Sequence, residues 1–322
     1  MKSILLFGSF CLAAVAAPDS APALIQRPSL GFAYDRSQGA VRPIQGIPGA
    51  AVIGEKLTLG FAVQAAVISP GHDFALAAVE DRRDPRLRLV LLHGGDPVSV
   101  PLDGAIASPN RMMLSPSGRA AVLGDASSRL QLITGLPGSP SISDLPAQFG
   151  FPLAVSDNGT TLFAGGDSAP VWLPAQGGAL PSSLPGSITV AAFQPSGTAA
   201  VAITRAGDVF LIRDPAGSAE VREIRAGDER TAGPVAAGLS ADGTHAFSIN
   251  GSGTASTIDL QAGTLAAVSC QCSPTGLQPL NSEPLFRINE ISSRPLLLFD
   301  GSGSEPRIWF VPAAGEARRT IQ

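Results

Sequence analysis

A short phrase returns along this chain at intervals of about forty residues, each time between two apolar runs. Its copies are Ser69-Pro70-Gly71, Ser115-Pro116-Ser117-Gly118, Ser156-Asp157-Asn158-Gly159, Gln194-Pro195-Ser196-Gly197 and Ser240-Ala241-Asp242-Gly243. The first residues of successive copies are about 46, 41, 38 and 46 positions apart, a spacing typical of repeat folds. Apolar runs flanking Pro, Gly, Asn and Asp indicate a strand, a tight turn and a second strand. The repeat therefore predicts a ring of similar β-sheets.

Each repeat unit has room for four short strands. In one unit they are expected over 188–193, 199–204, 208–213 and 220–224, and in the next over 235–239, 245–249, 256–260 and 265–269. The first strand of each unit is rich in small residues, as strands that converge on a central axis require. The predicted fold class is all-β, a β-propeller of four-stranded blades.

The number of blades follows from the spacing. About six units follow Phe61, and the segment from Gly31 to Ile44 adds a hairpin that copies the outer hairpins downstream. We expect this N-terminal hairpin to close the ring by pairing strands from both ends of the chain, which removes exposed sheet edges. The count favours seven blades, with six as the alternative.

On these turns the chain resembles the exported bacterial β-propellers with a Ser-Pro-Asp-Gly turn, the TolB-like and YVTN-type repeats, which are WD-like. The resemblance covers nearly the whole chain beyond its N-terminus, but no copy of the phrase is intact. Ser117, Asn158 and Ser196 replace its Asp, and Ala241 replaces its Pro. The Trp-Asp pair of eukaryotic-type repeats is absent. The resemblance implies the fold and no particular activity, because such propellers include lactonases, lyases and non-catalytic scaffolds.

The first sixteen residues have the pattern of a signal peptide. Lys2 supplies a positive start, Ile4 to Val15 an apolar core, and Ala14-Val15-Ala16 a small-residue cleavage motif, so cleavage is expected between Ala16 and Ala17. The apolar core is too short to span a bilayer, and no membrane span is expected. We therefore predict a signal peptide at 1–16, a linker at 17–29 and one propeller domain at 30–322. The mature protein is predicted to be exported to the periplasm or the medium.

The charge of the chain argues against a nucleic-acid partner. The net charge is −4, and Lys2 and Lys56 are the sole lysines, so no basic stripe exists to neutralise phosphates. We expect a monomer with a protein partner.

Two cysteines remain after the predicted cleavage, Cys270 and Cys272. On a strand, residues two apart point to the same face, and in an oxidising compartment their thiols can close a disulfide. A disulfide or two inert thiols is favoured over a redox pair or half of a metal site.

Signatures of chemistry are scarce. The sequence has no nucleophile elbow, phosphate loop, dinucleotide fingerprint or haem-attachment motif, and no catalytic residue, cofactor site or metal site is predicted. One Gly-rich loop, from Asp300 to Glu305, places oxygen atoms at alternate positions as hard cations prefer, but a polar hairpin turn is the favoured interpretation.

Two functions stay open. The favoured one is an exported, non-catalytic propeller that presents a loop face to a protein or an envelope component. The alternative is a propeller-type lyase or lactonase acting on a small molecule at the channel mouth. Clustered Asp, Glu and His there would favour the enzyme, whereas small and apolar side chains would favour the scaffold.

Overall fold

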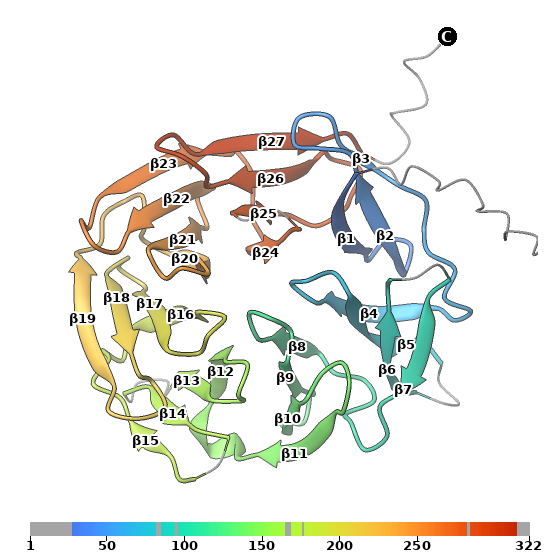
Figure 1. Cartoon of the computed structure of the whole chain (residues 1–322), viewed down its shortest axis with the longest axis horizontal. Helices are drawn as coiled ribbons and strands as arrows, with labels where there is room; N and C mark the ends of the chain where they lie inside the picture. The colour runs from blue at the N-terminus through green and yellow to red at the C-terminus, as the bar shows by residue number, and fades with distance from the viewer. Residues whose placement is uncertain are drawn as a thin grey trace, which may run out of the picture.

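The computed structural model describes residues 28–81, 85–93, 96–164, 169–175, 177–281 and 284–313. Seven antiparallel sheets stand around one axis (Figure 1). The first is β1 (Ser29–Asp35), β2 (Ala40–Gln45) and β3 (Val52–Ile53). The second is β4 (Val63–Ile68), β5 (Phe74–Val79), β6 (Leu87–Leu91) and β7 (Val98–Pro101). The third is β8 (Arg111–Leu114), β9 (Ala120–Gly124), β10 (Leu130–Thr134) and β11 (Ser141–Leu145).

The remaining sheets repeat the four-stranded plan. The fourth is β12 (Phe151–Val155), β13 (Thr161–Ala164), β14 (Val171–Leu173) and β15 (Leu180–Pro181), preceded by a short 3-10 turn at Ala147–Phe149. The fifth is β16 (Ile188–Phe193), β17 (Ala199–Thr204), β18 (Val209–Arg213) and β19 (Glu220–Arg225). The sixth is β20 (Pro234–Leu239), β21 (His245–Asn250), β22 (Thr254–Asp259) and β23 (Leu265–Ser269). The seventh is β24 (Gln278–Pro279), β25 (Leu285–Arg287), β26 (Leu296–Asp300) and β27 (Arg307–Val311).

The predicted seven-membered β-propeller is confirmed. In every four-stranded blade the strands are paired in chain order, with the first strand nearest the axis and the last on the rim (Figure 1). The first sheet has three strands instead of four.

The serine of the repeated phrase holds the inner hairpins closed. Ser115 Oγ accepts a hydrogen bond from Ala120 N at 2.9 Å, and Ser240 Oγ accepts one from His245 N at 3.0 Å. The glycine three residues later has a positive φ, 75° at Gly118 and 70° at Gly243, which other residues adopt only at a cost. The serine cap is made by Ser69, Ser115 and Ser240, whereas the left-handed fourth residue is common to all five copies of the phrase.

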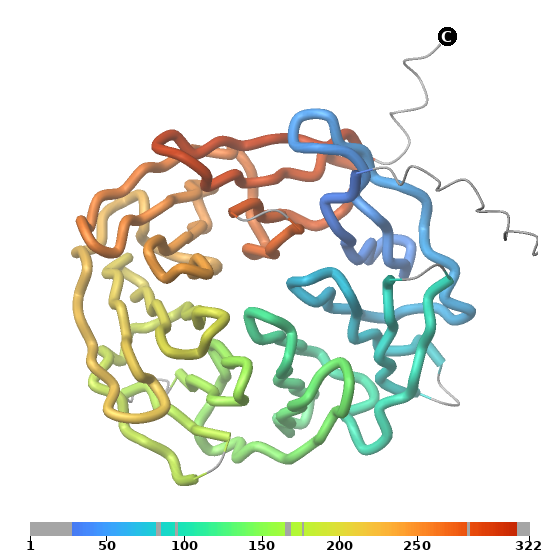
Figure 2. Tube along the Cα trace, viewed as in Figure 1, coloured from blue at the N-terminus to red at the C-terminus, as the bar shows by residue number. Residues whose placement is uncertain are grey.

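The N-terminal sheet takes the seventh place in the ring, between the second sheet and the last blade (Figure 2). The predicted pairing of strands from both ends of the chain is wrong, because every sheet is built from one continuous segment. The ring closes by packing instead: Leu30 and Ile44 share a buried core with Leu285, Leu298 and Val311 of the last blade. On the other face of the sheet, Tyr34 and Val41 pack with Val63 and Ile68 of the second sheet. The ring is therefore closed by side-chain packing and not by strand pairing.

Candidate functional site

A central cavity of about 740 Å³ lies on the ring axis. Its walls are formed by β4, β8, β12, β16, β20 and β24, the innermost strands of the six four-stranded blades, together with their turns. No residue of the three-stranded N-terminal sheet lines it. The N-terminal sheet has no described strand beside the cavity. In that place β4 of the second sheet and β24 of the last blade meet directly, since Gln278 Nε2 donates to Ile68 O at 3.4 Å.

The wall of the cavity is uncharged. Its side chains are mostly small or apolar, among them Val67, Met113, Ala192 and Ala237, with serines at the turns. Among the described residues that line it there is no Asp, Glu, His, Lys or Arg. The lyase or lactonase alternative needs carboxylates or histidines at this mouth for acid–base work or metal binding. No described residue that lines the cavity offers either, and Asp157 and His72 in the surrounding turns are bonded to backbone groups. The wall suits an uncharged ligand.

His72 is a buried polar side chain at the place where the ring closes. It occupies the position that Gly118 and Gly243 hold in later repeats, and it has their left-handed conformation, with φ 54°. Nδ1 accepts a hydrogen bond from Phe32 N at 2.9 Å, and Nε2 lies 3.0 Å from Pro279 O. One imidazole from the second sheet thus joins the N-terminal sheet to the last blade.

Burial keeps the His72 ring neutral. The side chain is 1 % exposed, and burial lowers its pKa to about 4, with nearby Arg287 acting in the same direction. The proton on the neutral ring sits on Nε2, because Nδ1 must accept from Phe32 and Nε2 must donate to Pro279. Gly31 makes room for the ring, since an added Cβ there would lie 2.5 Å from it.

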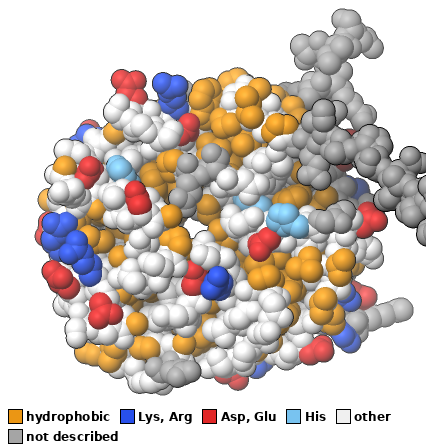
Figure 3. Space-filling model, in the orientation of Figure 1, with side chains coloured by type: hydrophobic (Ala, Val, Ile, Leu, Met, Phe, Trp, Pro, Cys, Tyr) orange, Lys and Arg blue, Asp and Glu red, His pale blue; other side chains and the backbone are white. Residues whose placement is uncertain are grey.

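Exposed apolar side chains lie on two rim segments that meet where the first and last sheets join, β27 and the segment after β2, and we call them the seam surface: Ile47, Val52 and Phe310. Phe310 is on the face of β27 opposite Trp309 and Val311, which pack toward the first sheet. Ile47 is 56 % exposed and Phe310 67 %. The loop that carries Ile47 contacts the last blade, because a Cβ added at Gly49 would lie 3.1 Å from the Trp309 ring. In the space-filling view, hydrophobic side chains gather over β27 and the loop between β2 and β3 (Figure 3).

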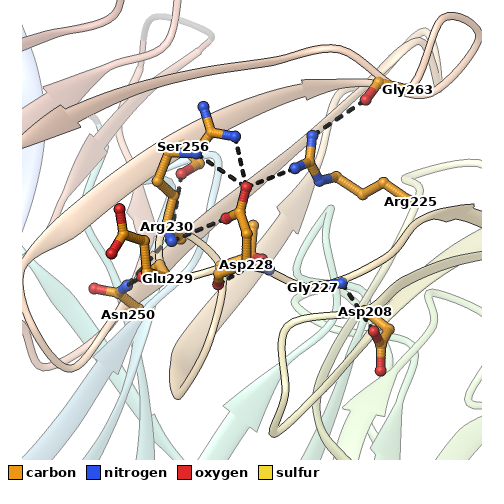
Figure 4. Close-up of polar contacts among 10 residues, drawn as sticks. Asp208, Arg225, Gly227, Asp228, Glu229, Arg230, Asn250, Ser256 and Gly263 are labelled. Atoms are coloured by element: carbon orange, nitrogen blue, oxygen red, sulfur yellow. Dashed lines mark hydrogen bonds and ion pairs between the residues drawn. The ribbon is translucent and has the colours of Figure 1, made fainter.

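A polar cluster fixes the loop between β19 and β20 (Figure 4). The Asp228 carboxylate accepts from Arg225 at 2.8 Å and from Arg230, and the hydrogen bond from Arg230 is the main reason that the pKa of Asp228 is low. Asn250 Nδ2 donates to the carbonyls of Glu229 and Arg230, each at 3.2 Å. The carboxylate and both guanidinium groups are paired, so we interpret the cluster as a loop anchor.

The loop that begins at Asp300 is a hairpin turn between β26 and β27. Asp300 Oδ1 accepts from Ser302 N at 3.0 Å and from Ser302 Oγ, and Oδ2 accepts from Trp309 Nε1 at 3.2 Å. Both carboxylate oxygens are therefore engaged within the turn. Across the part of the chain that the structure describes, no three His, Cys, Asp or Glu side chains gather as metal ligands would.

Cys270 and Cys272 form a disulfide in the link from β23 to β24, with sulfur atoms 1.99 Å apart. Both pack beside the aromatic core of Phe247, Phe286 and Phe299 that joins the last two blades. The predicted signal peptide and its cleavage site at Ala16 and Ala17 lie outside the described residues. Within the described ranges, no helix has the length and apolar character needed to cross a bilayer.

Neither His72 nor the seam surface was predicted from the sequence. One sequence signal pointed to His72: in Ser69-Pro70-Gly71-His72 the glycine stands one place early, so a histidine fills the left-handed position. The seam surface has no such signal, because its residues come from opposite ends of the chain.

No family model matches the chain. No curated protein matches its sequence. Solved structures share the fold. A protein described as functionally unknown from Desulfotomaculum acetoxidans aligns with a TM-score of 0.58 at 14 % identity, covering 89 % of this chain and 99 % of that one. Hsv2 from Kluyveromyces lactis aligns with a TM-score of 0.54 at 12 % identity, covering 88 % and 98 %. At such identities these likenesses establish the propeller fold alone.

Proposed function

We propose that this protein is an exported, non-catalytic β-propeller scaffold, of the TolB-like or YVTN-type kind, that binds a protein or envelope partner. The observation that carries the proposal is the seam surface. Phe310 and Ile47 are both largely exposed, and the segments that carry them meet above a packed core, where Gly49 lies against Trp309. Large exposed apolar groups are typical of protein contact sites.

The partner-binding role is tested with two phenylalanines that are equally exposed. Phe310 lies in the seam surface and Phe151 at the start of β12, and both are 67 % exposed. Phe310→Ser is expected to weaken capture of a partner from envelope extract at least tenfold, because it removes the largest apolar contact. Quantitative pull-down with the purified wild type, Phe310→Ser and Phe151→Ser measures this.

Phe151→Ser serves as the matched control and should capture the partner as the wild type does. Both variants should melt close to the wild type, since both side chains are exposed and Phe151 makes a surface cation–π contact, with Arg111 at 4.7 Å. Equal capture by all three proteins would exclude the seam surface as the binding site.

The export part of the proposal rests on the N-terminal sequence. Protein recovered from the periplasm or the medium is expected to begin at Ala17, because signal peptidase cuts after the small-residue motif that ends at Ala16. N-terminal sequencing of the recovered protein checks this. Recovery of the uncut chain from the cytoplasm alone would contradict export and leave the partner test unaffected.

A further inference from the structure

The central cavity is a second candidate site, distinct from the seam surface. We propose that it binds a neutral, largely apolar small molecule. Its volume of about 740 Å³ falls within the range of small-molecule pockets, which is about 300 to 1,000 Å³. The inference stands independently of the partner-binding proposal, because no seam-surface residue lines the cavity.

The uncharged wall of the cavity favours a neutral ligand over an ion. Met112, Met113, Leu114 and the alanines of β16 and β20 present apolar surface, and the described wall has no charged side chain. An ion entering the cavity would lose its hydration without gaining a counter-charge, and this penalty is large. A neutral molecule loses far less on entry and buries apolar area against the wall.

Backbone groups add to the polar contacts that the serines, Gln278 and Asn281 of the lining offer. Each inner strand is the edge strand of its sheet and has a strand partner on one side only. Edge strands present unpaired N–H and C=O groups, and here these edges are nearest the axis (Figure 1). A hydroxyl or carbonyl group on the ligand can therefore be recognised without any charged side chain.

The mouth of the cavity is preorganised. Neighbouring inner turns are bonded from blade to blade: Ser117 N donates to Asp157 Oδ1 at 3.0 Å, and Gln194 Nε2 donates to Ala241 O at 2.7 Å. His72 makes the corresponding link to Pro279 across the closure of the ring. A rim fixed before binding lowers the entropic cost of taking up a ligand.

Two dyes with the same ring system test the charge selection. N-phenyl-1-naphthylamine is neutral, and 8-anilino-1-naphthalenesulfonate carries a sulfonate. We expect the neutral dye to bind the folded protein at one site per chain with enhanced fluorescence, and the anionic dye to bind at least tenfold more weakly. Equal affinity for the two dyes, or no saturable binding of the neutral one, would overturn the proposal.

Variants then place the dye. Ala192→Phe places a phenyl ring at a wall position of the cavity and should weaken binding of the neutral dye strongly. Gly238→Ala is the milder test, since its added methyl would lie 3.6 Å from Phe286 and is tolerated without a clash. It should weaken binding severalfold at an unchanged melting temperature. Phe310→Ser and Phe151→Ser should bind the dye as the wild type does, and loss of binding in either would place the site outside the cavity. Wild-type binding by folded Gly238→Ala and Ala192→Phe would do the same.

Discussion

Deletion of Gly31–Gly46 is expected to lower the free energy of unfolding by several kcal/mol and to make the protein aggregate. The deletion removes Tyr34, Val41 and Ile44, all buried against the neighbouring sheets. Burial of one such side chain contributes about 1.5 to 3 kcal/mol to the free energy of unfolding. The deletion would also expose apolar faces on both neighbouring sheets, and such faces promote aggregation. Thermal unfolding and size-exclusion chromatography of the deleted and full-length proteins measure the two effects.

The exposed turn of the same hairpin provides the control. Gln38→Ala changes an exposed side chain at its tip and keeps the backbone hydrogen bond to Asp35, so it should leave the protein monomeric with a melting temperature near that of the wild type. A deleted protein that stayed monomeric and melted with the wild type would mean that the six four-stranded blades close without the N-terminal sheet.

The stability of the protein is expected to fall as the pH drops from 6.5 to 4, and His72 is expected to account for roughly 3 kcal/mol of that loss. The pKa of His72 is about 4 in the folded protein, against 6.5 for a free histidine. Between these two pH values His72 is protonated in the unfolded chain and neutral in the folded protein, so acid favours unfolding. The contribution is complete above pH 6.5, is lost progressively down to about pH 4, and changes no further below that.

His72→Asn isolates this effect. Asparagine tolerates the left-handed backbone, its Oδ1 can accept from Phe32 N, and it does not titrate. The difference in unfolding free energy between wild type and variant, measured by denaturant titration at several pH values, should shrink by roughly 3 kcal/mol from pH 6.5 to 4. All other titrating groups are common to the two proteins, so parallel curves would show that His72 does not titrate as its burial requires.

Much of the fold could be predicted because its signals are local. The strands expected over 188–193, 199–204 and 265–269 coincide with β16, β17 and β23. The apolar runs and the serine and glycine of the inner turns interact within a few residues of one another, so the pattern can be recognised in the sequence. The two-residue strand β24 was missed because Gln278–Pro279 is too short to carry a pattern.

The sequence by itself determined the repeat and the all-β ring, and it favoured seven places over six, because blade length and turn chemistry are encoded residue by residue. Only the tertiary structure decided how the ring closes and what its surfaces offer. His72 meets Pro279 across 207 positions, and Leu30 packs with Leu298 from the other end of the chain. The uncharged cavity likewise arises from six separate strands. Such long-range contacts produce no repeating pattern in the sequence of either segment. They form because the curvature of the ring brings the two ends of the chain together.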